Sequence, residues 1–245
     1  MKAAKNRSTH AYAQIREPKE HEKELQLKIE AEFPNFSGRL LDIGCANGAF
    51  IELISRRFPE AQYTGIDSSP EMIRVAQSRE IKGSCEFLVA DALTFNQGID
   101  YDIIIASGIL SIYDDFQEPL SNWISRLTES GVLFVFGCFN SRNIDAIYRY
   151  RNNEYGDGEW ESGLTSFSIE TVGKFLQQLE LSYVFDRFNL SIDLAEDPNP
   201  IRTYTRKTLD GETIIMNGAN IVTELFFLSV IAGDTRLNTN RLKST

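Results

Sequence analysis

The stretch from Leu40 to Phe50 constrains the fold of this chain more than any other. An apolar run ends in the acid Asp42, and a turn with glycines at positions 44 and 48 follows before an amphipathic segment. A buried strand, a tight glycine turn and a helix start are typical of the first crossover of a doubly wound α/β sheet. Because a helix N-terminus leaves backbone N–H groups free, the turn is also a candidate ligand site.

Two other interpretations of this turn stay open at this point. A dinucleotide-binding turn requires Gly-x-Gly-x-x-Gly, but here Ala46 stands between the two glycines and Phe50 follows them. An acid directly before the turn also suits a cationic ligand better than a pyrophosphate. The second alternative is a strand, turn and helix that bind no ligand.

Two further apolar stretches end in acids. Tyr63 to Ile66 is followed by Asp67, and Phe87 to Ala90 is followed by Asp91. A carboxylate at the end of the second strand, about 20 residues after a glycine turn, can accept both ribose hydroxyls of an adenosine. Together with Asp42, these acids end three successive strands, so they converge on one crevice at the carboxyl edge of the sheet.

The spacing of the first turn carries a family resemblance. Asp42, Gly44, Ala46 and Gly48 occupy the four fixed positions of the motif Asp/Glu-x-Gly-x-Gly-x-Gly, with Ala46 in place of the middle glycine. In this motif the chain resembles the class I, Rossmann-like methyltransferases that depend on S-adenosylmethionine (SAM). The α-ammonium and sulfonium groups of SAM match the cationic character that Asp42 favours.

The resemblance implies a role for each strand end. Asp67 would bind the ribose, Asp91 and the backbone N–H of Ala92 the adenine, and Met72 would pack on the adenine ring. The end of the fourth strand would border the transferred methyl group, and an N-terminal helix would supply Tyr12. The expected cofactor-binding residues are Tyr12, Asp42, Gly44, Cys45, Ala46, Gly48, Asp67, Ser68, Met72, Asp91, Ala92, Ser107, Gly108 and Ile109.

The resemblance also implies the architecture. We expect an N-terminal helical arm or lid over residues 1–34 and a single methyltransferase domain over 35–245, with substrate-side insertions at about 140–167 and 195–220. The domain would hold a mostly parallel seven-stranded sheet with helices on both faces and an antiparallel last strand. Asp210-Gly211 between alternating segments predicts an extra hairpin near the C-terminus.

Residues 143–151 are predicted to be helical, and the helix after the fourth strand is predicted to end at residues 130–131. Ser68 and Glu71 have the spacing of a capping box at the start of the helix after the second strand. The charges of residues 12–33 are interpreted as a solvated helix face.

The residues that meet the methyl acceptor are harder to find. Tyr113, Trp160, Arg202 and Tyr204 are candidate substrate contacts, although each also fits a structural or solvated position. A general base is needed only if the acceptor is protonated at working pH. Both histidines, at positions 10 and 21, lie in the N-terminal arm, so no catalytic base is named, and no cluster has the spacing of metal ligands.

Composition narrows the partners. The formal net charge is −10 and no sustained Lys/Arg cluster occurs, which disfavours nucleic acid. No apolar run reaches the roughly 18 residues of a membrane span, and the polar first ten residues lack an apolar signal core. The three cysteines form no Cys-x-x-Cys pair and fit a reducing compartment, so we expect a cytoplasmic protein. The oligomeric state stays open.

The sequence thus predicts SAM-dependent methyl transfer to a small-molecule acceptor, as an O- or N-methylation. A catalytically silent SAM-fold protein that serves as a binding or scaffold partner is the alternative. A nicotinamide-dependent oxidoreductase would need a third glycine that Phe50 and its neighbours do not supply.

Overall fold

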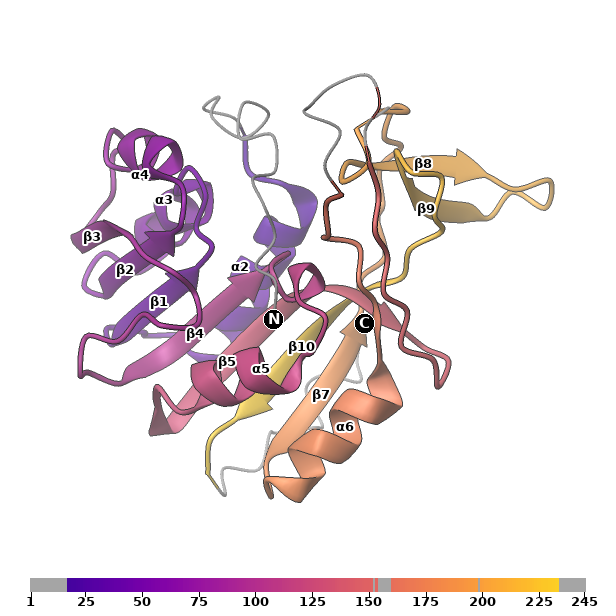
Figure 1. The fold of residues 1–245 in the computed structure, drawn as a ribbon. Helices are drawn as coiled ribbons and strands as arrows, with labels where there is room; N and C mark the ends of the chain where they lie inside the picture. The colour runs from indigo at the N-terminus through magenta and orange to yellow at the C-terminus, as the bar shows by residue number, and fades with distance from the viewer. Residues whose placement is uncertain (1–16, 152, 154–159, 198, 234–245) are drawn as a thin grey trace.

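The structure is a computed structural model that describes residues 17–151, 153, 160–197 and 199–233. Its centre is one sheet with the strand order β3-β2-β1-β4-β5-β10-β7, seen in Figure 1. The strands are β1 (Arg39–Ile43), β2 (Gln62–Asp67), β3 (Ser84–Val89), β4 (Tyr101–Ser107), β5 (Leu127–Asn140), β7 (Ser182–Arg187) and β10 (Leu225–Ile231). The short β6 (Phe167–Ser168) pairs with the end of β5.

The sheet is parallel from β3 to β5, while β10 runs antiparallel to both β5 and β7. The strand order reverses at β1, since the chain moves first outward to β2 and β3 and then back to β4. Such a reversal leaves a crevice beyond the carboxyl ends of the strands, where α/β proteins bind ligands. The predicted seven-stranded, mostly parallel sheet with an antiparallel last strand is confirmed.

Helices cover both faces because the central strands are apolar on both sides. Leu40, Ile103 and Ile105 face one hydrophobic cluster, while Leu41 and Ile104 face the other. The first cluster includes side chains from α2 (Glu20–Glu32), α3 (Ala49–Arg57) and α4 (Pro70–Ala76). The second includes side chains from α5 (Gln117–Ile124) and α6 (Ile169–Gln178).

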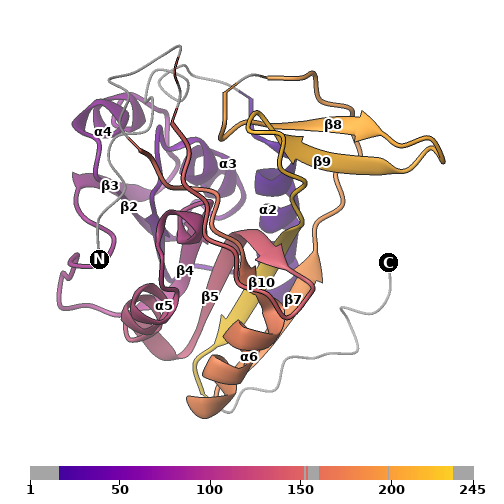
Figure 2. The ribbon, with the colours of Figure 1, turned by 45° about the vertical axis from the view of Figure 1, so that its right-hand side comes forward.

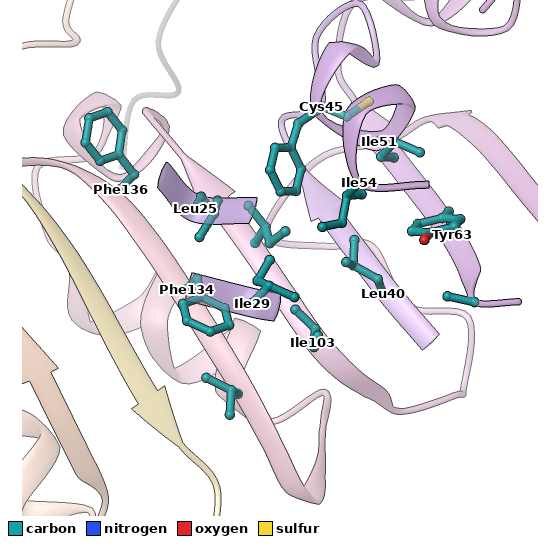
Figure 3. Close-up of a cluster of buried hydrophobic side chains, with 14 of the residues drawn as sticks. Leu25, Ile29, Leu40, Cys45, Ile51, Ile54, Tyr63, Ile103, Phe134 and Phe136 are labelled. Atoms are coloured by element: carbon teal, nitrogen blue, oxygen red, sulfur yellow. The ribbon is translucent and has the colours of Figure 1, made fainter. Parts of the chain in front are cut away.

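Helix α2 packs against the sheet. Leu25 and Ile29, one helical turn apart, are almost fully buried in the first cluster. Figure 3 shows both side chains among Ile103, Phe134 and Phe136 of the central strands. Leu27, between them, is 64% exposed. The helix therefore anchors one wall of the crevice through two aliphatic side chains.

A two-stranded hairpin, β8 (Thr203–Lys207) and β9 (Thr213–Asn217), stands apart from the main sheet in Figures 1 and 2. Its antiparallel register closes around the turn at Gly211, which has a φ of +83°. The hairpin lies between β7 and β10 in the chain, as predicted. Among the residues described, no helix has the length and apolar character to cross a membrane.

Two local expectations were wrong. Residues 143–151 are not helical, because Ala146 and Tyr150 form antiparallel bridges with Ser166 and Glu161. A helix there would have had little apolar surface to bury, since Ile144 and Ile147 are more than half exposed.

The helix after β4 was expected to run to residues 130–131, but α5 ends at Ile124 and β5 begins at Leu127. Leu127 pairs with Tyr101, and a β-irregularity follows before Val132 pairs with Ile103. A Cβ at Gly131 would lie 2.9 Å from the carbonyl oxygen of Tyr101. Gly131 therefore permits close strand packing rather than ending a helix.

Candidate functional site

A cavity of about 900 Å³ lies at the carboxyl ends of β1, β2, β4 and β5. Its other walls come from α2, from residues 188–197 and 201–203, and from residues 217–225. This volume is at the upper end of the usual range for small-molecule sites. The sequence-predicted residues that line it are Asp42, Gly44, Cys45, Ala46, Asp67, Ser68, Met72, Asp91, Ala92, Ser107, Gly108, Ile109, Tyr113 and Arg202.

The turn after β1 is held in a left-handed conformation at three positions. Gly44, Ala46 and Gly48 have φ values of +73°, +47° and +74°. A Cβ at Gly44 would lie 2.5 Å from Cγ2 of Ile109, so only glycine fits there. Ala46 adopts a conformation that costs an L-residue roughly 1–2 kcal/mol. The turn thus brings its backbone to the cavity at some conformational cost.

Asp67 ties this turn to the start of α4. Its Oδ2 accepts a hydrogen bond from the Ala46 N–H (3.0 Å), and its Oδ1 accepts one from the Ser69 N–H (2.8 Å). Burial raises the pKa of Asp67, while these two N–H groups oppose the rise. Each carboxylate oxygen has two lone pairs, so Asp67 keeps acceptor capacity toward the cavity that it lines.

Ser69, and not Ser68, caps α4. The Ser69 hydroxyl accepts a hydrogen bond from the Met72 N–H at 3.3 Å, one position later than the predicted cap. Ser68 instead lines the cavity beside Asp67, and Met72 is 3% exposed at the same wall.

Asp91 organises the loop after β3. Its Oδ1 accepts hydrogen bonds from the N–H groups of Leu93 (2.9 Å) and Thr94 (3.1 Å). The side chain is exposed and lines the cavity together with Ala92. Its charge also reaches Tyr113, whose pKa is raised to about 12 by burial and then by Asp91 and Glu118. Tyr113 therefore lies toward the Asp91 end of the cavity.

Asp42 is the most unusual group in the site. Its side chain lines the cavity although the residue is only 4% exposed, and within the described part of the chain its carboxyl group makes no hydrogen bond. Burial, followed by the charges of Glu22 and Asp67, raises its pKa to about 8. A buried carboxyl group without a hydrogen-bond donor is costly. A cationic ligand group would supply both a donor and an opposite charge. Asp42 therefore fits a ligand that carries positive charge.

Helix α2 contributes residues that the sequence analysis did not select. His21, Glu22 and Leu25 all line the cavity, and Glu22 is only 9% exposed although its charge was interpreted as part of a solvated face. Its Oε2 accepts a hydrogen bond from the Lys19 N–H at 2.7 Å. The helical spacing of Glu22, Leu25 and Ile29 was the signal that could have placed Glu22 on the buried face.

His21 stacks on an aromatic residue at the end of β5. The ring centroids of His21 and Phe136 are 4.3 Å apart and the rings are nearly parallel. Phe188, directly after β7, meets Phe136 edge to face at 5.3 Å. Helix α2, β5 and the chain after β7 therefore form one aromatic corner of the cavity.

Three described candidates do not line the cavity. A Cβ at Gly48 would lie within 3.0 Å of Phe87 and Ala76, so this glycine serves helix packing. Tyr204 is 1% exposed and donates its hydroxyl to Asn220 at 2.8 Å within the hairpin region. Trp160 is 61% exposed, with the Arg151 guanidinium over its ring. One further candidate, Tyr12, lies outside the described residues.

The acids after β4 are engaged elsewhere. Asp114 pairs with Arg149, and Asp115 accepts a hydrogen bond from the Gln117 N–H at the start of α5. Over the described residues, no group of three or more His, Cys, Asp or Glu side chains is arranged to hold a metal ion. The site therefore presents backbone groups, carboxylates and apolar walls.

Comparisons with known proteins show that part of this chain resembles methyltransferases. The family model described as a methyltransferase domain matches residues 41–133. Trans-aconitate 2-methyltransferase of Streptomyces avermitilis is 33% identical over 106 residues, which is 42% of this chain and 39% of the relative. The Escherichia coli enzyme of that name is 37% identical over 94 residues, or 38% of this chain and 36% of the relative. The chain thus matches about two fifths of the length of these relatives.

Solved structures extend the likeness over most of the chain. The plantazolicin methyltransferase BpumL, in a complex with a desmethylPZN analog and SAH, gives a TM-score of 0.56 at 16% identity and covers 87% of this chain and 83% of that one. The DhpI–SAM–HEP complex gives 0.59 at 14% identity and covers 91% of each chain. At this identity the likeness establishes the fold. Residues 41–133 therefore match a methyltransferase domain, and the chain shares the Rossmann-like fold of the plantazolicin methyltransferase.

Proposed function

We propose that this protein transfers the methyl group of SAM to an oxygen or nitrogen atom of a small-molecule acceptor. One observation carries the proposal. Three acids at the ends of successive parallel strands, Asp42, Asp67 and Asp91, line one cavity with the glycine turn. The innermost of them is a buried carboxyl group that no described residue neutralises or hydrogen-bonds. A nucleoside joined to a cationic amino acid matches this order of groups.

Each part of the cofactor has a partner in this proposal. Asp67 accepts from the ribose hydroxyls, while Asp91 and the Ala92 N–H bind the adenine, against which Met72 packs. The amino-acid end lies at the turn after β1, where Asp42 attracts its positive charge. Ser107, Gly108 and Ile109 at the end of β4 border the methyl group.

The chemistry asks little of the protein beyond positioning. The sulfonium of bound SAM supplies an activated methyl group, so the chain has to hold an acceptor atom in line with it and exclude water. A general base is required only for an acceptor that is protonated at working pH. We assign no residue to that role.

The relatives support the methyl donor more strongly than the acceptor. The family match covers the segment from β1 into β5, which contains the turn and all three acids. The part of the chain after residue 133, which supplies much of the opposite wall, lies outside the match. The substrate in the relatives' name is therefore not carried over to this chain.

Calorimetric titration with SAM, with its demethylated product S-adenosylhomocysteine (SAH) and with NAD tests the proposal. We expect micromolar binding of SAM and SAH and no binding of NAD. Asp67→Ala should weaken SAH binding by roughly 1.5–3 kcal/mol for each ribose hydrogen bond lost. Binding of NAD alone would overturn the proposal in favour of an oxidoreductase. Binding of none of the three would favour a silent scaffold.

A further inference from the structure

The cavity extends well beyond the part that a nucleoside would fill. Asp91 and Asp67 mark its nucleoside end at β3 and β2, and the strand order then leads through β1 and β4 to β5 and β10. The remaining walls are α2, Phe136 on β5, and residues 188–197 and 201–203. We call this remaining part the acceptor chamber, because it adjoins the end of β4 where the methyl group is proposed to lie.

A row of apolar side chains forms one wall of the acceptor chamber. Leu190, Ile192 and Leu194 occupy alternate positions after β7, and all three line the cavity. Asp193, between two of them, pairs with Lys207 of the hairpin at 3.4 Å. The Leu194 N–H donates to the Thr205 hydroxyl at 2.8 Å, which ties this segment to β8. Ile192 is 43% exposed, so a ligand that covered it would gain apolar contact.

The floor of the chamber is aromatic and tightly packed. Phe136 and Phe188 are 6% and 5% exposed and line the cavity edge to face with one another. The imidazole of His21 covers Phe136 from α2. Apolar and aromatic walls that converge in this way take up ligands with an apolar body.

The charges around the cavity oppose an anionic acceptor. Apart from the three strand-end acids assigned to the cofactor, the carboxyl residues that line it are Glu20, Glu22 and Asp197, and the Lys and Arg residues are Lys19 and Arg202. Like charges in a cleft repel a ligand strongly because the surrounding protein has a low dielectric constant. A ligand with several carboxylates would need several cations, and the described lining supplies two.

We infer that the methyl acceptor is an uncharged or amine-bearing compound with an apolar body, and not a polycarboxylate. Its body lies along Leu190, Ile192 and Leu194, and its reactive oxygen or nitrogen faces the end of β4. The inference rests on the proposed function for the place of the methyl group. It separates this chain from the substrate named in its sequence relatives, which match only about two fifths of it.

Three probes with the same aliphatic body test the charge preference. Octylamine, 1-octanol and octanoate are titrated into the full chain saturated with SAH, together with trans-aconitate as a tricarboxylate. We expect octylamine and 1-octanol to bind at least tenfold more tightly than octanoate, and trans-aconitate to show no binding. Tighter binding of octanoate or trans-aconitate would overturn the inference, and so would the absence of binding by all four. Failure of SAH itself to bind would instead contradict the proposed function.

A pair of variants tests the apolar wall. Ile192→Asn replaces a side chain that is already partly exposed, so folding should survive, and it should weaken 1-octanol binding by about tenfold. Leu209→Asn, in the fully exposed hairpin turn, is the matched control and should leave binding unchanged. Both variants should bind SAH like the parent protein. Unchanged 1-octanol binding by Ile192→Asn would contradict the proposed wall.

Discussion

The two halves of the cavity differ in how they are built. The proposed cofactor half rests on three parallel strands whose ends are followed at once by turns, and the Ala46 N–H donates a hydrogen bond to Asp67 there. The proposed acceptor chamber is assembled from helix α2, the end of β5 and connections on both sides of the hairpin. The family model matches residues 41–133, which include the turn and the three acids of the first half. Residues at strand ends are constrained by the sheet, whereas connections can vary while the sheet stays intact.

The largest expected effect comes from filling the glycine turn. In Gly44→Ala the new Cβ would meet Ile109 at 2.5 Å with φ at +73°, so the turn must shift. We expect about 2–4 kcal/mol lower stability, from backbone strain and overpacking, and loss of SAH binding by at least a hundredfold. Denaturant unfolding and calorimetry measure the two effects.

Gly98→Ala is the control for that variant. Gly98 has a φ of +70° but no atom within 4 Å of the added Cβ. Gly98→Ala should therefore lower the folding stability by about 1–2 kcal/mol from backbone strain alone and bind SAH like the parent protein. An equal loss of SAH binding in Gly44→Ala and Gly98→Ala would show that the turn after β1 has no special role in binding SAH.

The next effect is a pH dependence from Asp42. Its pKa is raised to about 8 from the ordinary value of 3.8, so the folded protein binds this proton more tightly than the unfolded chain. The resulting stability is fully present below about pH 4 and is lost as the pH rises to about 8. Melting temperatures of Asp42→Asn should decline less than those of the parent between pH 5 and 9. Parallel profiles would show that Asp42 is not protonated in the folded protein.

The same carboxyl group should respond to the cofactor. SAM affinity should increase from pH 6 to 8 in the parent protein, because the ligand's positive charge favours ionised Asp42. The α-ammonium of SAM titrates near this range as well. The contribution of Asp42 is therefore the difference in the pH dependence of SAM affinity between the parent protein and Asp42→Asn. Equal slopes for the two proteins would contradict a contact between Asp42 and the cationic end.

A smaller effect is expected in the hairpin region. Tyr204→Phe removes the hydrogen bond to Asn220 and should cost about 0.5–1.5 kcal/mol of stability. Because Tyr204 does not line the cavity, binding of SAH and of 1-octanol should stay unchanged. A specific loss of 1-octanol binding would restore Tyr204 as a substrate contact.

The smallest effect is expected at the position where the motif departs from its family. Ala46→Gly would relieve the strain of a left-handed conformation at φ +47°, which stabilises the folded state. It would also increase the conformational entropy of the unfolded chain, and the two contributions to stability nearly cancel. Stability should change by less than about 1 kcal/mol, and SAH binding should stay within a fewfold. A large loss of binding would mean that the Ala46 side chain itself contacts the cofactor.

The success of sequence reasoning follows the same division of the cavity. Asp42, Asp67 and Asp91 could be placed because an apolar run fixes each strand and the doubly wound topology brings the strand ends together. Glu22 and His21 were missed because their place depends on how α2 packs on the sheet, which charge pattern alone did not indicate. Helical spacing around Leu25 held that information.

Other errors arose where pairing partners are distant in sequence. Residues 143–151 were expected to be helical, but their bridges to residues 161–166 decided the outcome. Tyr204 was selected for its place in the predicted hairpin beside the cleft, but its hydroxyl donates a hydrogen bond to Asn220 inside the hairpin region. The alternating apolar positions of Leu190, Ile192 and Leu194 were a usable signal, but such a pattern does not reveal whether its apolar side faces a core or a ligand.

Hydrogen–deuterium exchange with and without SAH tests the division of the cavity most directly. We predict slower exchange in peptides that cover residues 42–48, 67–72 and 91–94, where the cofactor would contact backbone and strand-end acids. Peptides that cover residues 188–194 should be unaffected by SAH alone. Protection of residues 188–194 without protection of the three strand-end turns would contradict the account.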